Sequence, residues 1–274
     1  MQNNNHKAQQ KFWRDVELPY IEARFVRHGS ELRYARHWHD TFSVGIITGG
    51  RSSYLNGTTA VEVDKGTLVV INPGDIHVCN PVDGTDWSYL MFYFDTAWFG
   101  RVQAECGGDA DGAFRPYTTA ATHAPHLASA GEQLFATLTD SDSDRLAREV
   151  AVTDYAALLA RDLAPGAIDP PDAGRKIEGA AQYIDAHFTE ALRLDAICAA
   201  AKLSSSYLIR AFKKRYGVAP HEYQTNRRIQ HAQARLREGL PIAQVALETG
   251  FADQAHFQRT FKRLTAATPG QYRG

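Results

Sequence analysis

An internal repeat in the last hundred residues constrains this chain more than any other feature of its sequence. The segment Tyr207–Tyr223 aligns with His256–Tyr272 at a constant offset of 49 residues. The matched pairs are Arg210 with Arg259, Phe212 with Phe261, Lys213 with Lys262, Lys214 with Arg263, Pro220 with Pro269, and Tyr223 with Tyr272. Two copies of one motif in register predict two similar structural units.

Each copy follows a short apolar segment and a tight turn, which is the pattern of a helix-turn-helix. The second helix of such a unit needs an apolar face that docks on the first helix, and polar donors near its N-terminus, which enters the major groove of DNA. The apolar spacing predicts helices over residues 175–188, 194–201, 205–216, 220–237, 242–249 and 254–264.

The charge of the chain is divided between its two halves. Residues 1–174 hold 14 Lys and Arg against 23 Asp and Glu, a net charge of −9, whereas residues 175–274 hold 16 against 8, a net charge of +8. The overall charge of −1 conceals this division. A basic helical module beside an acidic module indicates a protein that binds a polyanion with one part only. The Pro- and Gly-rich stretch 165–174 is the expected linker.

The segment Pro241–Arg273 closely resembles the signature of the AraC/XylS family of bacterial transcriptional regulators, and the likeness extends over residues 175–274. The resemblance implies two helix-turn-helix units joined by the helix 220–237. It implies base-reading positions at Ser205, Ser206, Ile209, Arg210, Gln254, Ala255, Gln258 and Arg259. His256 adds a further donor, and Lys213, Lys214, Lys262 and Arg263 suit contacts with phosphates. Two positions depart from expectation: Lys202 stands where the first turn usually carries glycine, and Ala255 is small for a base-reading residue.

The acidic half reads as short strands followed by helices, so the whole chain is predicted to be a multidomain α+β protein. Strands are expected at Phe42–Ile47, Ser52–Leu55, Val61–Val63, Gly66–Ile71 and Trp87–Phe94. Their regular spacing favours a sandwich or a small barrel, and residues 105–122 stay unassigned. Helices are expected at 126–138 and 143–163, the second capped by Ser143, and they either pack on the β domain or dimerise.

Within this half, His37-Trp-His-Asp40 and Asn72-Pro-Gly-Asp-Ile-His77 make residues 20–100 resemble the cupin-type effector-binding domain of the same family. The resemblance implies a β-barrel over residues 21–122 that holds a small ligand. It also implies that a mobile arm, residues 1–20, can fold over the pocket. The expected effector contacts are His37, His39, Tyr54, His77, Trp87 and Tyr93.

Three histidines close together raise the question of a metal. His37, His39 and His77 could supply imidazole ligands to zinc, iron or nickel. Metal-binding cupins add a glutamate shortly after the histidine pair, and here Asp40 would point away from His39 along a strand. We therefore expect no metal and no cofactor. The histidines then either hydrogen-bond a small polar ligand or, for His77, simply cap a turn.

The remaining features limit the functional class. No apolar run approaches the roughly 20 residues that cross a bilayer, and the N-terminus lacks the apolar core of a signal peptide. Three scattered cysteines indicate reduced thiols and a cytoplasmic protein. Catalytic triads, phosphate-binding loops and dinucleotide fingerprints are not found in the sequence. We thus expect a ligand-responsive DNA-binding regulator rather than an enzyme, commonly an activator.

The expected partners of such a regulator are double-stranded DNA, a small-molecule effector, RNA polymerase and a second copy of the chain, but no membrane. It would work in the cytoplasm, at the nucleoid. Two alternatives stay open: a metal-dependent cupin enzyme fused to a DNA-binding module, and a DNA-binding dimer that responds to no effector.

Overall fold

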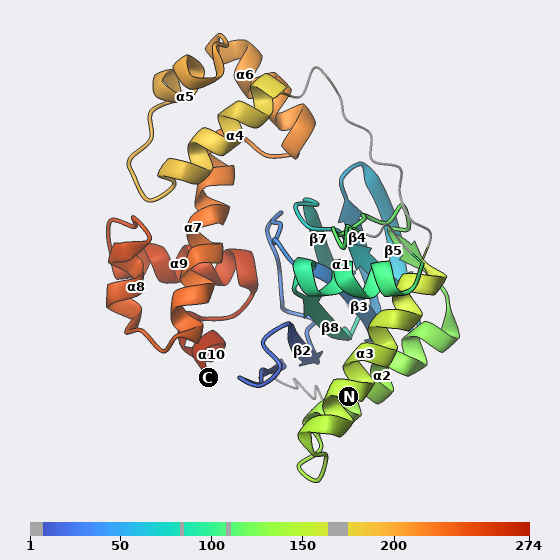
Figure 1. Cartoon of the computed structure of the whole chain (residues 1–274). Helices are drawn as coiled ribbons and strands as arrows, with labels where there is room; N and C mark the ends of the chain where they lie inside the picture. Colours follow the sequence, from blue (N-terminus) through green and yellow to red (C-terminus); the bar gives the residue numbers. More distant parts are fainter. Residues whose placement is uncertain (1–7, 83–84, 108–110, 164–174) are drawn as a thin grey trace. The chain divides into compact units, whose positions relative to one another are not determined.

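The computed structural model describes residues 8–82, 85–107, 111–163 and 175–274, and the chain divides into two compact units (Figure 1). The first unit comprises residues 1–33 and 39–168, and the second comprises residues 34–38 and 169–274. The linker expected at residues 165–174 lies outside the described residues. The division places a β-rich unit before a helical one, as the charge division suggests.

Two antiparallel sheets build the first unit. The larger sheet has the order β1-β2-β8-β3-β6-β9, and the smaller has the order β5-β4-β7. The strands are β1 (Gln9–Trp13), β2 (Ile21–Arg27), β3 (Phe42–Gly49), β4 (Arg51–Asn56), β5 (Thr59–Asp64), β6 (Leu68–Ile71), β7 (His77–Pro81), β8 (Ser88–Phe94) and β9 (Ala121–Thr122). The predicted α+β class is confirmed. The predicted barrel is corrected, because no strand pairing joins the two sheets among the described residues.

A glycine turn marks the place where the chain passes from the larger sheet to the smaller one. Gly50 has φ +74°, and a Cβ there would lie 1.5 Å from the carbonyl oxygen of Asp86. Only glycine fits such a backbone approach. The alternation of apolar residues predicts which face of a strand is buried, but not which strand edges join. The sequence therefore could not distinguish two sheets from one closed barrel.

The first strand shows that the expectation of a mobile arm over residues 1–20 is wrong for Gln9–Trp13. This segment pairs antiparallel with β2 at the edge of the larger sheet. Arg24 on β2 is only 4% exposed, donates to Oε1 of Gln10 at 2.6 Å and lies 5.0 Å from the ring centre of Phe12. The low strand propensity of glutamine concealed this strand, which cross-strand contacts stabilise.

Three helices cover one face of the larger sheet: α1 (Thr96–Glu105), α2 (Pro125–Thr139) and α3 (Arg145–Asp162) (Figure 1). The sequence left open whether the second and third of these helices pack on the β domain or dimerise, and the structure shows that they pack on it. The ring centres of Phe92 on β8 and Tyr155 on α3 lie 5.6 Å apart. Helix α1 was not predicted, although Asp95 caps it by accepting from the N–H of Trp98 at 2.8 Å. Asp144, rather than Ser143, caps α3.

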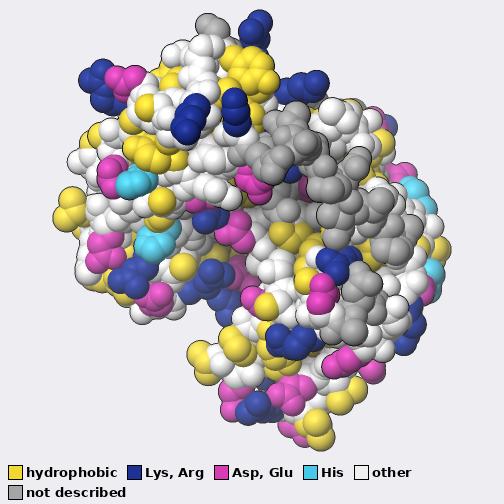
Figure 2. All heavy atoms as spheres, turned by 45° about the horizontal axis from the view of Figure 1, so that its top comes forward, with side chains coloured by type: hydrophobic (Ala, Val, Ile, Leu, Met, Phe, Trp, Pro, Cys, Tyr) yellow, Lys and Arg dark blue, Asp and Glu magenta, His cyan; other side chains and the backbone are white. Residues whose placement is uncertain are grey.

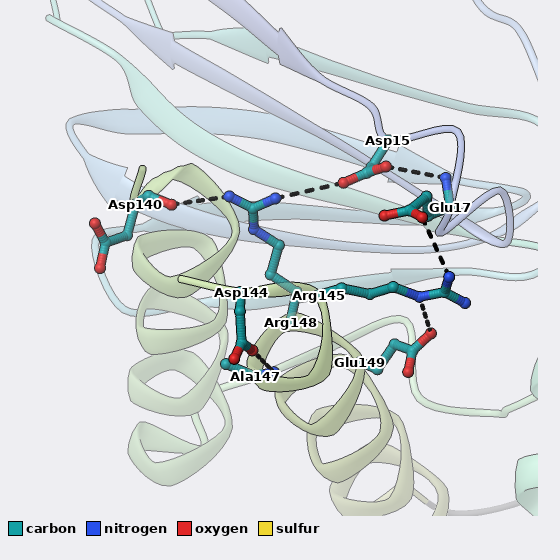
Figure 3. Close-up of polar contacts among 8 residues, drawn as sticks. All are labelled: Asp15, Glu17, Asp140, Asp144, Arg145, Ala147, Arg148 and Glu149. Atoms are coloured by element: carbon teal, nitrogen blue, oxygen red, sulfur yellow. Dashed lines mark hydrogen bonds and ion pairs between the residues drawn. The ribbon is translucent and has the colours of Figure 1, made fainter. Parts of the chain in front are cut away.

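Arginines near the start of α3 hold the turn that precedes β2 (Figure 3). Arg145 pairs with Glu17 at 3.2 Å and with Glu149 at 2.9 Å, while Arg148 lies 3.4 Å from a carboxylate oxygen of Asp15. Such partly exposed pairs each contribute little to stability. Together they hold the turn at residues 15–17 against the first turn of α3.

The second unit is built from seven helices among the described residues. They are α4 (Arg175–His187), α5 (Leu194–Ala201), α6 (Ser205–Tyr216), α7 (Pro220–Arg237), α8 (Ile242–Glu248), α9 (Gln254–Thr265) and α10 (Pro269–Arg273). The six predicted helices are confirmed, and α10 is additional. Helix α7 connects the α5–α6 pair to the α8–α9 pair (Figure 1). None of the described helices has the length and apolar character needed to span a membrane.

The repeat extends to backbone conformation. Gly217 at the end of α6 and Ala266 at the end of α9, again 49 residues apart, are both in the left-handed region, with φ +68° and +51°. In the turns, Lys202 has φ +53° and Gly250 has φ +78°. Each copy of the repeat thus has two residues in the left-handed region, of which one is glycine. That glycine is Gly217 in the first copy and Gly250 in the second. The turn geometry tolerates Lys202, which explains why this departure leaves the fold intact.

We predict that Gly250→Ala destabilises the chain by about 3 kcal/mol, because a Cβ there would meet the carbonyl oxygen of Thr189 at 2.1 Å as well as strain the backbone. The matched control is Gly239→Ala, since Gly239 has φ +84° but no atom within 4 Å of where the new methyl group would lie. It should cost only about 1 kcal/mol. Urea unfolding measures both, and equal losses would contradict a role for the close approach.

Candidate nucleic-acid interface and ligand site

Helices α6 and α9 each bury one face and expose the other. Leu208 and Phe212 of α6 and Phe257 and Phe261 of α9 are completely buried, so these faces dock each helix on the unit's core. The opposite faces carry the predicted DNA contacts. The exposed ones are Ser205, Arg210, Lys213, Lys214, Gln254, Ala255, His256, Gln258, Arg259, Lys262 and Arg263. Ile209 is half-buried, and the side chain of Ser206 lies outside the described part.

The basic side chains on these faces are available for contacts with a polyanion. Arg210, Lys213 and Lys262 form no ion pair within the described part of the chain. Figure 2, which brings α5 and α6 forward, shows Lys and Arg side chains around that end of the unit. At α9, Asp253 caps the helix by accepting from the N–H of His256 at 2.7 Å, and this hydrogen bond lowers the pKa of the Asp253 carboxyl.

One side chain of α7 fixes how the two helix-turn-helix pairs are joined. Arg228 donates from Nε to the carbonyl of Phe188 at 2.7 Å and from Nη2 to the carbonyl of Glu190 at 2.7 Å. Burial lowers the pKa of this guanidinium from its usual value. The carbonyl of Thr189, between these two acceptors, is the atom that Gly250 approaches. The loop after α4 is thereby held against α7 and against the second turn.

A short segment from the connection between β2 and β3 also belongs to the second unit. Trp38 is 4% exposed and stacks on Tyr223 of α7, with ring centres 4.4 Å apart. Its carbonyl accepts hydrogen bonds from Asn226 at 2.9 Å and from Gln230 at 2.8 Å. Sequence reasoning missed this role, since a lone tryptophan between two histidines gives no sign of its partner.

The structure brings together three of the six predicted effector contacts within the first unit. The rings of His39 and His77 lie 4.8 Å apart, and the ring of Tyr93 lies 5.3 Å from that of His39. His37 belongs to the second unit, together with Trp38. The strand expected through His39 and Asp40 is wrong, because both residues lie in the connection before β3.

Two hydroxyl groups that the sequence did not single out complete this cluster. Nδ1 of His39 lies 3.2 Å from the hydroxyl oxygens of both Thr41 and Ser43. Ser43 is completely buried on β3. A serine on the buried face of a strand indicates a polar site, because buried hydroxyl groups need hydrogen-bond partners. The sequence alone does not show that this face of β3 is buried.

Tyr54 and Trp87, two further predicted effector contacts, are buried in the first unit. Tyr54 is completely buried, its hydroxyl donates to the carbonyl of Val70 at 2.9 Å, and burial raises its pKa. Trp87 is 2% exposed and packs on Tyr89. Cys79 on β7 is half-buried, and the burial of its thiol raises the pKa to about 11 and keeps the thiol protonated.

A separate hollow of about 720 Å³ opens in the first unit between the larger sheet and α2. Apolar side chains form part of its lining and basic side chains another part. The lining residues are Lys11, Phe25, Arg27, His28, Thr48, Ser88, Leu90, Glu132, Phe135 and Thr139. None of these was predicted, because the hollow exists only where α2 packs over the strands.

A β-rich domain with a polar cluster, followed by two linked helix-turn-helix pairs, defines a ligand-responsive transcriptional regulator. Residues 19–154 match the sequence model of the AraC-like ligand-binding domain, and residues 197–274 match that of a helix-turn-helix domain. The two domains in this order show that the chain belongs to the AraC family of DNA-binding transcriptional regulators.

Relatives and solved structures agree with this assignment. The HTH-type transcriptional regulator YbfI of Bacillus subtilis (strain 168) is 24% identical over 239 residues, which is 86% of each chain. The HTH-type transcriptional regulator SACOL0084 of Staphylococcus aureus (strain COL) is 38% identical over 100 residues, 36% of this chain and 13% of that protein.

The two-domain fold is shared with ToxT of Vibrio cholerae. An apo variant of ToxT aligns with a TM-score of 0.59 at 13% identity, covering 99% of this chain and 98% of that one. Wild-type ToxT bound to an unsaturated fatty acid aligns with a TM-score of 0.54 at 15% identity, covering 100% and 97%.

Proposed function

We propose that the chain binds specific DNA sites as a homodimer in the cytoplasm, responds to a small molecule in its β-rich unit, and activates transcription through RNA polymerase rather than catalysing a reaction. The observation that carries the proposal is the repeated pair of exposed donor faces on α6 and α9, both attached to α7. Two recognition helices on one connecting helix suit successive turns of the major groove.

The two kinds of exposed side chain have different tasks in this proposal. Arg210, Gln258 and Arg259 suit base edges, because arginine and glutamine can form paired hydrogen bonds with guanine and adenine. Lys213 and Lys262 lie further along the helices and suit phosphates, which fix register without reading sequence. The direct test selects bound fragments from the source genome and footprints the best one. Protection of about two major-groove turns per monomer supports the proposal, and the absence of any preferred fragment overturns it.

We predict that Arg259→Ala costs roughly 1–3 kcal/mol at the specific site and relaxes selectivity at one base pair. Lys213→Ala should weaken binding to all sequences alike and lower the slope of log affinity against log salt by about 1. Lys65→Ala, an exposed lysine of the first unit, is the control and should change neither quantity. Titrations at several salt concentrations, on matched and mismatched sites, measure these effects. An equal loss of affinity on matched and mismatched sites for Arg259→Ala would contradict the proposal that Arg259 reads a base.

For the effector, we assign the cluster around His39, His77 and Tyr93 as the binding site. Its polar groups from β3, β7 and β8 converge in one place. The hollow beneath α2 is the second candidate, because Phe25 and Phe135 beside Lys11 and Arg27 suit an amphipathic anion. The fatty acid bound by ToxT is a ligand of that chemical kind.

We predict that a cellular small molecule changes DNA affinity, and that His77→Ala removes this response while Arg27→Ala retains it. A ligand can shift the equilibrium only through different affinities for the two states, so losing its contacts abolishes the response. DNA binding with and without fractionated cell extract measures it. If only Arg27→Ala abolishes the response to the effector, the hollow beneath α2 is the effector site. An affinity indifferent to every fraction would support a dimer without an effector.

For the dimer, we assign an exposed apolar patch formed by Val16, Leu146 and Val150. Leu146 and Val150 are one turn apart on α3, with exposed fractions of 67% and 50%, and Val16 is 95% exposed. The turn that carries Val16 is held to α3 by Arg145 and Arg148 (Figure 3). Adjacent exposed apolar side chains on a fixed surface suit an interface between two copies.

We predict that the double variant Leu146→Glu and Val150→Glu is monomeric, because two buried carboxylates would face each other across the interface. The control is Leu247→Glu, which changes an apolar residue on α8 that is 77% exposed and should leave the dimer intact. Sedimentation measures the mass of each. A dimer that persists in the double variant places the interface elsewhere.

A further inference from the structure

We propose that residues 34–38, which we call the brace segment, fix the two helix-turn-helix pairs of the second unit relative to each other, and that Trp38 is a positioning residue for DNA recognition. This role rests on the proposed function, because it concerns how α6 and α9 contact DNA together. The brace segment belongs to the second unit, although residues 33 and 39 on either side of it belong to the first.

At one end of the brace segment, Trp38 is attached to the first helix-turn-helix pair. Its ring stacks on that of Tyr223 in the first turn of α7, with ring centres 4.4 Å apart. The ring of Tyr223 in turn lies 5.3 Å from those of Phe212 and Tyr216 on α6. Trp38 therefore completes an aromatic cluster that includes the first recognition helix.

The backbone of Trp38 is held on the same face of α7. Its carbonyl accepts hydrogen bonds from the side-chain amides of Asn226 at 2.9 Å and Gln230 at 2.8 Å. Tyr223, Asn226 and Gln230 are three and four residues apart, so they lie on one face of the helix. Asn226 is only 3% exposed, and a buried amide that loses its acceptor is costly. The burial of Asn226 therefore favours the bound position of the brace segment.

At its other end, the brace segment reaches the second recognition helix. The N–H of Ala35 donates to the carbonyl oxygen of Arg263 at 3.0 Å, in the last turn of α9. The N–H of Ala267, which a longer helix would offer to this carbonyl, donates instead to the hydroxyl oxygen of Thr265 at 3.3 Å. Ala35 thus satisfies a carbonyl that the end of a helix leaves open.

Between these two attachments the brace segment is short and internally held. Nδ1 of His37 lies 2.9 Å from the carbonyl oxygen of Ala35, and the rings of Tyr34 and His37 stack with their centres 5.7 Å apart. The segment therefore joins the end of α9 to α7 and, through the aromatic cluster, to α6. Helices such as α7 bend, so a second connection beside it limits how far the two recognition helices move relative to each other.

Recognition helices held in this way require a fixed spacing in the DNA. One base pair inserted between the two contacted stretches moves one of them by about 3.4 Å along the axis and rotates it by about 35°. A rigid protein cannot keep both sets of base contacts on such a site, whereas a protein with loosely joined pairs can follow the change. Selectivity for spacing is thus the property that the brace segment provides, and a residue that only supports the fold would not alter it.

The test uses the full-length chain and its preferred DNA site, with and without one base pair inserted between the two protected stretches. The wild type should bind the unaltered site about 10-fold or more tightly than the altered one, because one lost base contact typically costs about that factor. Trp38→Ala should bind the unaltered site about 10-fold more weakly and lower the ratio between the two sites to about 3-fold or less. Trp38→Phe keeps an aromatic ring against Tyr223 and should restore most of the ratio.

A second variant keeps the test valid if Trp38→Ala misfolds. Ala35→Pro removes the N–H that reaches α9 and should also lower the ratio between the two sites. The matched control is Trp98→Ala. Trp98 stacks on Tyr20 in the first unit with ring centres 4.5 Å apart, so its loss removes a comparable aromatic contact outside the brace segment and should leave the ratio unchanged. A wild-type ratio in both Trp38→Ala and Ala35→Pro overturns the proposal, even if both variants are less stable.

Amide hydrogen exchange on the same full-length samples separates the brace segment from the proposed function. Without DNA, the amides of residues 262–267 should exchange about 10-fold faster in Trp38→Ala than in the wild type or in Trp98→Ala. Faster exchange in a chain that prefers no DNA site supports the brace segment and counts against the regulator. A chain that prefers a DNA site, but whose variants show neither faster exchange nor a lower ratio, refutes the brace segment alone.

Discussion

The second unit depends on how the backbone carbonyls that follow α4 are satisfied. A backbone carbonyl is a strong hydrogen-bond acceptor, and almost all of them in native structures have a partner. Arg228 and Gln224 on α7 both donate to the carbonyls of Phe188 and Glu190. The turn that begins at Gly250 packs against the carbonyl between them. The same contacts therefore satisfy the loop after α4 and join the two helix-turn-helix pairs through α7.

The sequence predicted this unit well because its constraints are local and occur twice. The boundaries of α5, α6 and α7 follow from apolar spacing and from glycine and proline signals at their ends, and these agree with the structure. The exposure of Arg210 and Arg259 follows from the burial of their neighbours Phe212 and Phe261. The segment around Trp38 could not be predicted, since it comes from a distant part of the chain and carries no periodic signal.

The first unit was predicted less well because its constraints are non-local. Alternation predicts which strand faces are buried, but edge pairing decides whether strands close a barrel, and here they form two sheets. For the same reason the sequence could not show that Tyr54 and Trp87 are almost completely buried. His39, His77 and Tyr93 could be predicted as a group from residue type, whereas the backbone carbonyls that contact the two imidazole rings are placed by the fold.

The burial of Trp38 holds a segment of the β2–β3 connection in the second unit. An aromatic side chain buries about 150–250 Å², and at about 25 cal/mol per Å² this corresponds to roughly 4–6 kcal/mol. This free energy exceeds what partly exposed ion pairs contribute, so the packing of Trp38 on Tyr223 is a main cause of the inclusion of residues 34–38 in the second unit.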